Sequence, residues 1–272
     1  MSTFVETQKN NSLTTPTVRL ERLDEGAIAV LTLDDQARAN AMSPEMGDAF
    51  KSHIHSIKDD PSLRAVVIRG AGKDFSIGGH RDMLIRLGSG EIPGDKLHDF
   101  MLAFYDRWLP MLEIPVPVIS ALQGDCIGVA PVFACAPDIA IADETLNLQI
   151  TFANLNFYPG MALASLLARK VGPGRTALLA VAGEIVNGRE AERLGLVERC
   201  VPAGKAYDEA LRIARQVATA APSTVRLLKK NFGLKKSDLA ADLEQNAAQQ
   251  AKDLQTAEYR ERVANYLPDH YA

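Results

Sequence analysis

Short apolar runs, each followed by a glycine-containing turn or a helical segment, recur through the first half of the chain. The runs at 27–33 (AIAVLTL), 64–69 (RAVVIR) and 117–122 (PVISAL) are rich in β-branched residues, so we expect each to form a strand. Between the first two runs, Ser43 and Pro44 supply the capping residue and the first-turn proline that open a helix. Strands that alternate with helices predict parallel βαβ units and an α/β fold.

The second half of the chain is mostly helical in its pattern. One more strand is expected at 138–142, and from Leu163 onward the expected helices are 163–171, 174–182, 189–194, 205–219, 223–232 and 237–266. We divide the chain into a loose polar tail (1–16), a core that carries the site (17–205) and a helical C-terminal region (206–272). The last helix has only a thin apolar stripe, which we expect to pack on a neighbouring subunit.

Charge and composition exclude several classes of function. A net charge of −4 without a dense Lys/Arg stripe argues against a nucleic-acid surface. The sequence has no run of about 18 apolar residues and no signal-peptide pattern, so no membrane span or secretion is expected. Three cysteines without CxxC spacing favour a reducing, cytoplasmic location. His53 and His55 would point about 200° apart on a helix, so no metal site is expected.

Two glycine-rich segments carry the strongest indication of chemistry. They are 70–83 (GAGKDFSIGGHRDM) and 117–132 (PVISALQGDCIGVAPV), and in each the glycines stand where a strand gives way to a helix. Glycine lets the backbone turn sharply and direct N–H groups at a ligand, and a helix N-terminus adds the positive end of its dipole. Either segment alone reads as a tight turn. Together they could hold one negatively charged oxygen atom.

These two segments resemble the crotonase, or enoyl-CoA hydratase/isomerase, superfamily. Four further pieces match in the same order: QARANAM (36–42), DIAIAD (138–143), FYPGM (157–161) and GREAERLGLVERCVP (188–202). The resemblance runs from about Val18 to Tyr266. It implies a spiral of ββα turns with C-terminal helices, assembled as a homotrimer or a dimer of trimers. It also implies an acyl-CoA thioester substrate, with coenzyme A as part of the substrate and no separate cofactor.

The resemblance assigns roles to particular backbone positions. The two N–H groups of the oxyanion hole are expected at Gly79 and Val129. Two such donors stabilise a thioester enolate, and one can contribute about 3 kcal/mol to the transition state. The coenzyme A is expected to lie along five residues: Ala37, Arg38, Ala39, Ser76 and Ile77.

The chain departs from the family pattern at the two glutamates that activate water in hydratases. Their positions fall on Val132 and Phe152, which we expect to line the acyl pocket instead. Hydration must deliver hydroxide to one carbon and a proton to the next, so it needs groups that transfer protons. We therefore expect decarboxylation, isomerisation or C–C cleavage rather than glutamate-dependent hydration.

Three polar residues are candidates for proton transfer in place of the glutamates. His80 replaces the aspartate common after the first oxyanion residue, and it could act as a base, contact coenzyme A or serve only as a hydrogen-bonded histidine. Tyr158 lies on the loop that forms the wall of the acyl pocket in relatives, where a packing role is the alternative. Asn154, with Thr151, flanks Phe152 and could hold a water molecule or a substrate carboxylate.

Two alternative functions stay open at this point. The chain could be a catalytically silent acyl-CoA binding protein that lost its acid/base pair. The piece NFYPGM also resembles decarboxylases of polyketide β-branching, which act on acyl-carrier-protein thioesters. Those enzymes use a lysine after the first oxyanion residue and a histidine in the C-terminal helix. Here the first position offers Arg81, Arg86 or Lys96 without a clear register, and the second offers Gln249 and Gln250.

Overall fold

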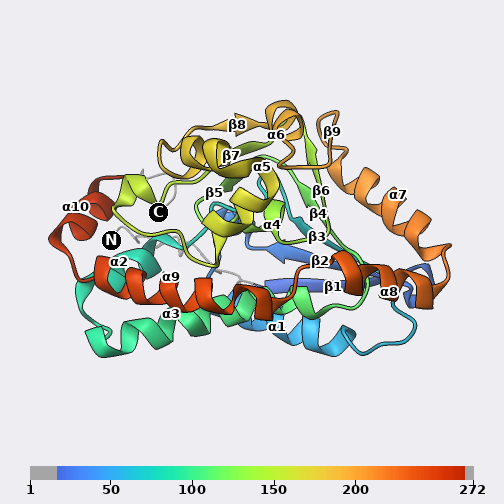
Figure 1. The fold of residues 1–272 in the computed structure, drawn as a ribbon, viewed down its shortest axis with the longest axis horizontal. Helices are drawn as coiled ribbons and strands as arrows, with labels where there is room; N and C mark the ends of the chain where they lie inside the picture. Colours follow the sequence, from blue (N-terminus) through green and yellow to red (C-terminus); the bar gives the residue numbers. More distant parts are fainter. Residues whose placement is uncertain (1–16, 267–272) are drawn as a thin grey trace, which may run out of the picture.

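A computed structural model describes residues 17–266, in which a six-stranded sheet forms the centre (Figure 1). The predicted tail, residues 1–16, lies outside the described part. The strands of this main sheet, in spatial order, are β1 (Thr17–Leu23), β2 (Ile28–Asp34), β3 (Ala65–Gly70), β4 (Val118–Leu122), β6 (Ile139–Asp143) and β9 (Arg199–Val201). β1 pairs antiparallel with β2, and every other pair is parallel.

The four predicted strands are confirmed within one residue at each end, as β2, β3, β4 and β6. β1 was not predicted because its sequence, TVRLERL, places charged residues between the apolar ones. As the edge strand of the sheet, β1 fully buries only Val18 among its residues.

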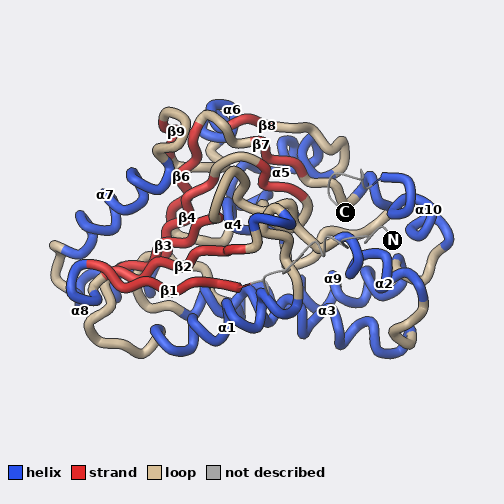
Figure 2. Tube along the Cα trace, turned by 180° about the vertical axis from the view of Figure 1, so that it is seen from behind, coloured by secondary structure: helices blue, strands red, loops and turns tan. Residues whose placement is uncertain are grey.

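A second, three-stranded sheet contains β5 (Asp125–Ile127), β7 (Asn147–Gln149) and β8 (Val186–Asn187). The chain passes from β4 to β5 and then into α4 (Val132–Cys135), and it passes in the same way from β6 to β7 and then toward α5 (Leu163–Ala180). Figure 2 shows the two sheets from behind. These repeated turns form the ββα spiral that the family resemblance implied.

Helices cover both faces of the main sheet. The remaining α-helices are α1 (Pro44–Ile57), α2 (Arg81–Ser89), α3 (Gly94–Trp108), α6 (Gly188–Leu194), α7 (Ala206–Ala218), α8 (Pro222–Phe232), α9 (Ala240–Asp253) and α10 (Ala257–Tyr266). The short 3-10 segments are η1 (Asp24–Gly26), η2 (Gln36–Arg38), η3 (Leu109–Glu113), η4 (Ala153–Leu155) and η5 (Lys236–Leu239). The predicted cap of α1 is confirmed, because Ser43 Oγ accepts from Met46 N at 3.2 Å.

The hydrophobic core lies on both sides of the main sheet. On one face α7 packs small alanine side chains, Ala206, Ala210 and Ala214, against the strands. On the other face α1 and α3 enclose the larger core, in which the rings of Phe50 and Trp108 lie 5.4 Å apart. The sequence predicted that the C-terminal helical region begins after residue 205. α7 is the first helix of that region, and it packs on β3, β4 and β6 of the main sheet (Figure 1).

One helical prediction differs from the structure in a way that the sequence explains. The single helix predicted at 237–266 is divided into η5, α9 and α10. The break falls where Thr256 Oγ1 accepts from Tyr259 N at 3.2 Å and so caps a new helix. The pair predicted at 163–171 and 174–182 is confirmed, because α5 consists of two helical stretches joined across a kink at Gly172, just before Pro173.

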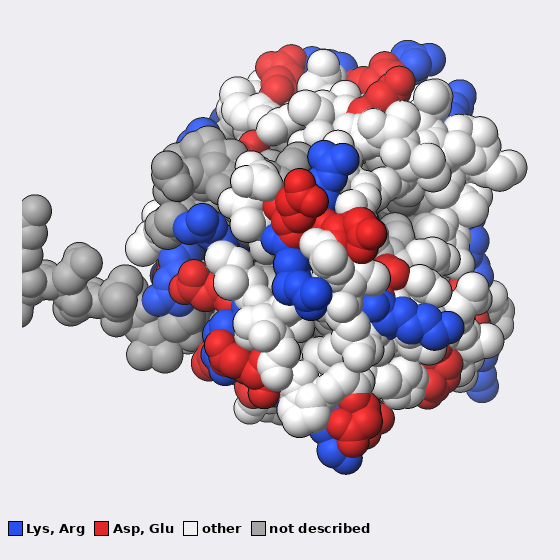
Figure 3. All heavy atoms as spheres, turned by 90° about the vertical axis from the view of Figure 1, so that its left-hand side faces the viewer, with Lys and Arg blue, Asp and Glu red and all other residues white. Residues whose placement is uncertain are grey.

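The described surface carries charges of both signs (Figure 3), and the three cysteines form no disulfide. On the face that carries α2 and α10, Lys and Arg side chains are interspersed with Asp and Glu (Figure 3). Within residues 17–266, no helix is long and apolar enough to cross a membrane. Cys126, Cys135 and Cys200 are all buried and unpaired.

Candidate active site

The two glycine-rich junctions lie against each other. They follow β3 and β4, which are adjacent parallel strands, so both junctions lie at the same edge of the main sheet. Ser76 N donates to Asp125 O at 3.0 Å, and Ile127 N donates to Ser76 O at 3.0 Å, which joins the first junction to β5. Gly78 has a φ of +83°, and a Cβ at this position would lie 2.5 Å from Ile127 O. Only glycine allows the two loops to approach this closely.

Two backbone amides at this contact have no acceptor within residues 17–266. Their neighbours all donate: Gly78 to Ser76 Oγ (3.1 Å), His80 to Met42 O (3.4 Å), Gly128 to Gln149 O (2.9 Å) and Ala130 to Ile127 O (3.1 Å). Within the described part of the chain, Gly79 N and Val129 N donate to no other residue. Val129 is buried and Gly79 is half-buried. Because buried backbone N–H groups are nearly always paired, two unpaired ones at one contact mark a place that is open to an external acceptor.

Gly79 and Val129 both line one cavity of about 380 Å³. Its walls are mostly apolar: Met83, Leu84, Leu87, Met101, Phe104, Phe152, Leu155 and Phe157. Five polar side chains also reach it: Arg81, Tyr105, Gln149, Thr151 and Gln250. No Asp, Glu or His is among the described residues that line this cavity. A larger groove, of about 1110 Å³, lies between α3, α8 and α9 and contains neither unpaired amide.

Comparison with known proteins places this chain in a family. The family model for enoyl-CoA hydratase/isomerase matches residues 24–269. The chain belongs to the enoyl-CoA hydratase/isomerase family. It is 32% identical over 248 residues to a protein of Mycobacterium tuberculosis named as a probable enoyl-CoA hydratase, covering 87% of this chain and 93% of the relative. It is 30% identical over 211 residues to a carnitinyl-CoA dehydratase of Proteus mirabilis, covering 76% and 77%.

A solved structure supports the same assignment. The crystal structure of an enoyl-CoA hydratase/isomerase from Pseudoalteromonas atlantica matches with a TM-score of 0.80 and 26% sequence identity. The match covers 92% of this chain and 96% of that one. The resemblance found in the sequence motifs is therefore confirmed at the level of family and fold.

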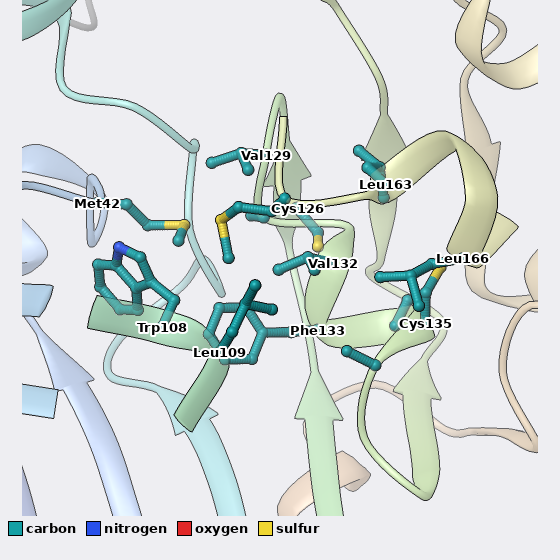
Figure 4. Close-up of a cluster of buried hydrophobic side chains, with 14 of the residues drawn as sticks. Met42, Trp108, Leu109, Cys126, Val129, Val132, Phe133, Cys135, Leu163 and Leu166 are labelled. Carbon is teal, nitrogen blue, oxygen red and sulfur yellow. The ribbon is translucent and has the colours of Figure 1, made fainter. Parts of the chain in front are cut away.

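The residues that family resemblance assigned to the substrate lie in three different environments. Ile77 and Phe152 line the cavity. Ser76 is fully buried beneath it, where its Oγ donates to Asn40 O at 2.7 Å and accepts from Gly78 N, so it fixes the shape of the junction. Val132 is also fully buried, in the apolar cluster that contains Cys126 (Figure 4). As the first residue of α4, Val132 directs its side chain into the core and does not line the cavity.

The loop expected to hold coenzyme A lies next to the cavity but outside its lining. Ala37 is exposed, and Arg38 and Ala39 are half-buried. Ala39 O accepts from Ile77 N at 3.2 Å, which joins this loop to a residue of the cavity wall. Arg38 Nη1 lies 3.3 Å from Asp35 Oδ2.

The three side chains predicted for proton transfer do not line the cavity. His80 is the residue before α2 and lines a neighbouring hollow of about 350 Å³ together with Arg38 and Glu45. Asn154 is exposed on η4. Tyr158 is half-buried; its backbone N donates to Asp253 Oδ2 at 2.9 Å, and its backbone O accepts from Gln250 Nε2 at 2.7 Å.

Tyr105, which the sequence did not indicate, meets Gln250 inside the cavity, and the sequence had offered Gln250 only at the position of a histidine in related decarboxylases. Tyr105 of α3 donates its hydroxyl to Gln250 Oε1 of α9, while Gln250 Nε2 is held by Tyr158 O. Burial raises the pKa of Tyr105, so its hydroxyl stays protonated at neutral pH. Thr151 adds a second hydroxyl: its Oγ1 would lie 3.6 Å from a Cβ at Gly128, which is the residue before the second unpaired amide.

Proposed function

We propose that this chain acts on acyl-CoA thioesters and binds the thioester oxygen between the amides of Gly79 and Val129. The supporting observation is that both amides lack an acceptor among the described residues and line the same cavity. An oxygen atom placed between them would accept two N–H bonds. These bonds strengthen as the oxygen gains negative charge, so they stabilise an enolate more than the starting carbonyl. A single donor of this kind contributes about 3 kcal/mol.

The cavity lining favours reactions that need no pair of acid/base side chains. Its described residues include no carboxylate and no imidazole, so a water molecule could not be activated there in the manner of a two-glutamate hydratase. Decarboxylation makes the smallest demand, because the electrons of the broken C–C bond flow into the enolate as carbon dioxide leaves. The enolate carbon then takes a proton from water, and our candidate to orient that water is the hydroxyl of Thr151, which lines the same cavity.

A change at Gly79 tests the proposal directly. Gly79→Pro removes the N–H, whereas Gly79→Ala keeps it and adds a methyl group that meets only side-chain ends, Met83 Cε at 3.3 Å and Leu84 Cδ2 at 3.4 Å. With crotonyl-, methylmalonyl- and β-diketone-type thioesters as the panel, we expect Gly79→Pro to lose about 10²–10³-fold in turnover of any substrate accepted. Gly79→Ala should stay within about tenfold of the parent rate. Unchanged turnover in a folded Gly79→Pro variant would disprove the oxyanion assignment.

A second function, silent binding of acyl-CoA, is favoured by the same lack of acid/base side chains in the cavity. The thioester panel separates it from catalysis. Micromolar binding of the thioesters with turnover of none would establish the binder and exclude the enzyme.

A further inference from the structure

Arg81 is the one ionised side chain among the described residues that line the acyl cavity. It is the first residue of α2 and lies two positions after the unpaired amide of Gly79. The chain direction at this junction therefore brings a guanidinium to the same cavity as the proposed oxyanion hole. The rest of the lining is apolar or neutral.

The guanidinium of Arg81 has no partner within residues 17–266. Its Nε is buried and makes no hydrogen bond, and it is the only arginine nitrogen of the described chain in that condition. Arg81 also borders a smaller hollow of about 300 Å³ next to α10, and the described lining of that hollow contains no Asp or Glu either. By contrast, Arg86 on the same helix is paired with Glu91 at 2.9 Å.

An unpaired buried donor on a charged group is costly, so the arrangement suits an anion brought by a ligand. A guanidinium matches the two oxygens of a carboxylate, with two parallel N–H···O bonds. The apolar walls on the other sides suit a short hydrocarbon chain, and a cavity of about 380 Å³ is at the small end of ligand sites. The ligand that fits both features is an acyl chain ending in a carboxylate.

We infer that Arg81 binds a carboxylate on the acyl group and makes thioesters of dicarboxylic acids the preferred substrates of this site. This inference rests on the proposed function, because it takes the thioester carbonyl to lie at Gly79 and Val129. A dicarboxylic thioester has a single free carboxylate, and Arg81 holds it throughout the reaction, so isomerisation or C–C cleavage, and not decarboxylation, is the reaction expected on these substrates. An ion pair with a departing carboxylate would stabilise the charged reactant over neutral carbon dioxide and so oppose its loss.

Binding measurements test the role of Arg81 without requiring turnover. Calorimetric titration would compare succinyl- and glutaryl-CoA with butyryl- and valeryl-CoA, which have similar chains without the carboxylate. The full-length parent protein should bind the carboxylated thioesters about ten- to a hundredfold more tightly, the value of a charge-assisted hydrogen bond. Arg81→Gln should lose this preference and keep the parent affinity for the uncharged thioesters. Arg81→Lys should retain part of it.

Arg260 provides the matched control. It borders the same small hollow as Arg81 but not the acyl cavity. Arg260→Gln removes an equal charge from this corner of the molecule and should leave the preference unchanged. Equal affinities for charged and uncharged thioesters in the parent, or a preference that survives in folded Arg81→Gln, would overturn the inference while leaving the oxyanion proposal intact. Failure of every thioester to bind would instead refute the proposed function and the inference with it.

Discussion

Two glycines with nearly the same positive φ allow the contact between the junctions to be tested. Gly78 and Gly90 have φ values of +83° and +84°. Alanine at either position therefore meets about the same backbone penalty, about 1–2 kcal/mol for a left-handed conformation. They differ in their surroundings: a Cβ at Gly90 meets nothing within 4 Å, whereas a Cβ at Gly78 lies 2.5 Å from Ile127 O and 3.2 Å from Val129 N.

The difference between the two variants measures the cost of separating the junctions. Ile127 O is a backbone atom held in β5, so the added methyl group at residue 78 must displace a loop rather than a flexible side chain. Overpacking of this kind costs about 1–3 kcal/mol. Gly78→Ala should therefore lower the free energy of unfolding by about 2–5 kcal/mol, against about 1–2 kcal/mol for Gly90→Ala.

Displacement of the loop in Gly78→Ala should also lower the rate of thioester turnover, because it moves the amides of the proposed oxyanion hole. A shift of about 1 Å in a catalytic group can cost about 10²-fold in rate. Denaturant unfolding and thioester turnover, measured on both variants, would give the two effects separately. If Gly78→Ala matched Gly90→Ala in stability and kept the parent rate, the two junctions would not form a single site.

Two further predictions concern the stability of the fold. Lys229 Nζ donates to Asp138 Oδ2 at 2.7 Å, with both side chains less than a tenth exposed, so Lys229→Met should cost about 3–5 kcal/mol by leaving a buried charge. The double variant with Asp138→Asn should recover much of that loss in denaturant unfolding, and an equally unstable double variant would contradict this account. Hydrogen bonding from Arg212 lowers the pKa of Glu209 from 4.5 to about 2. This pair therefore stabilises the fold above about pH 4.5 and loses that contribution as the pH falls toward 2. Glu209→Gln should flatten the pH dependence of the free energy of unfolding in this range. An unaltered slope would show that the pair contributes nothing.

The sequence predicted the features that depend on neighbouring residues. The β-branched runs became β2, β3, β4 and β6, and Ser43 caps α1 as expected, because strand and cap preferences act over a few residues. The two junctions could be located for the same reason: their glycines follow directly after the strands. Assembly into trimers stays a prediction.

The polar part of the cavity could not be predicted from local patterns. Tyr105 and Gln250 are 145 positions apart, and only the packing of α3 against α9 brings them together. His80 and Tyr158 failed to reach the cavity for a related reason. A motif fixes where the backbone runs, but the direction of each side chain depends on the packing around it. At Tyr158, the backbone N donates to Asp253 Oδ2 and the backbone O accepts from Gln250 Nε2, so α9 holds both backbone groups.

The position of Gln250 has a consequence for the order in which the site is built. Tyr105 and the two junctions belong to the first half of the chain. Gln250, which bonds to both the Tyr105 hydroxyl and Tyr158 O, lies near the C-terminal end of the chain. A chain synthesised from its N-terminus therefore contains the residues of both amides well before it contains the glutamine that completes this side of the binding chamber.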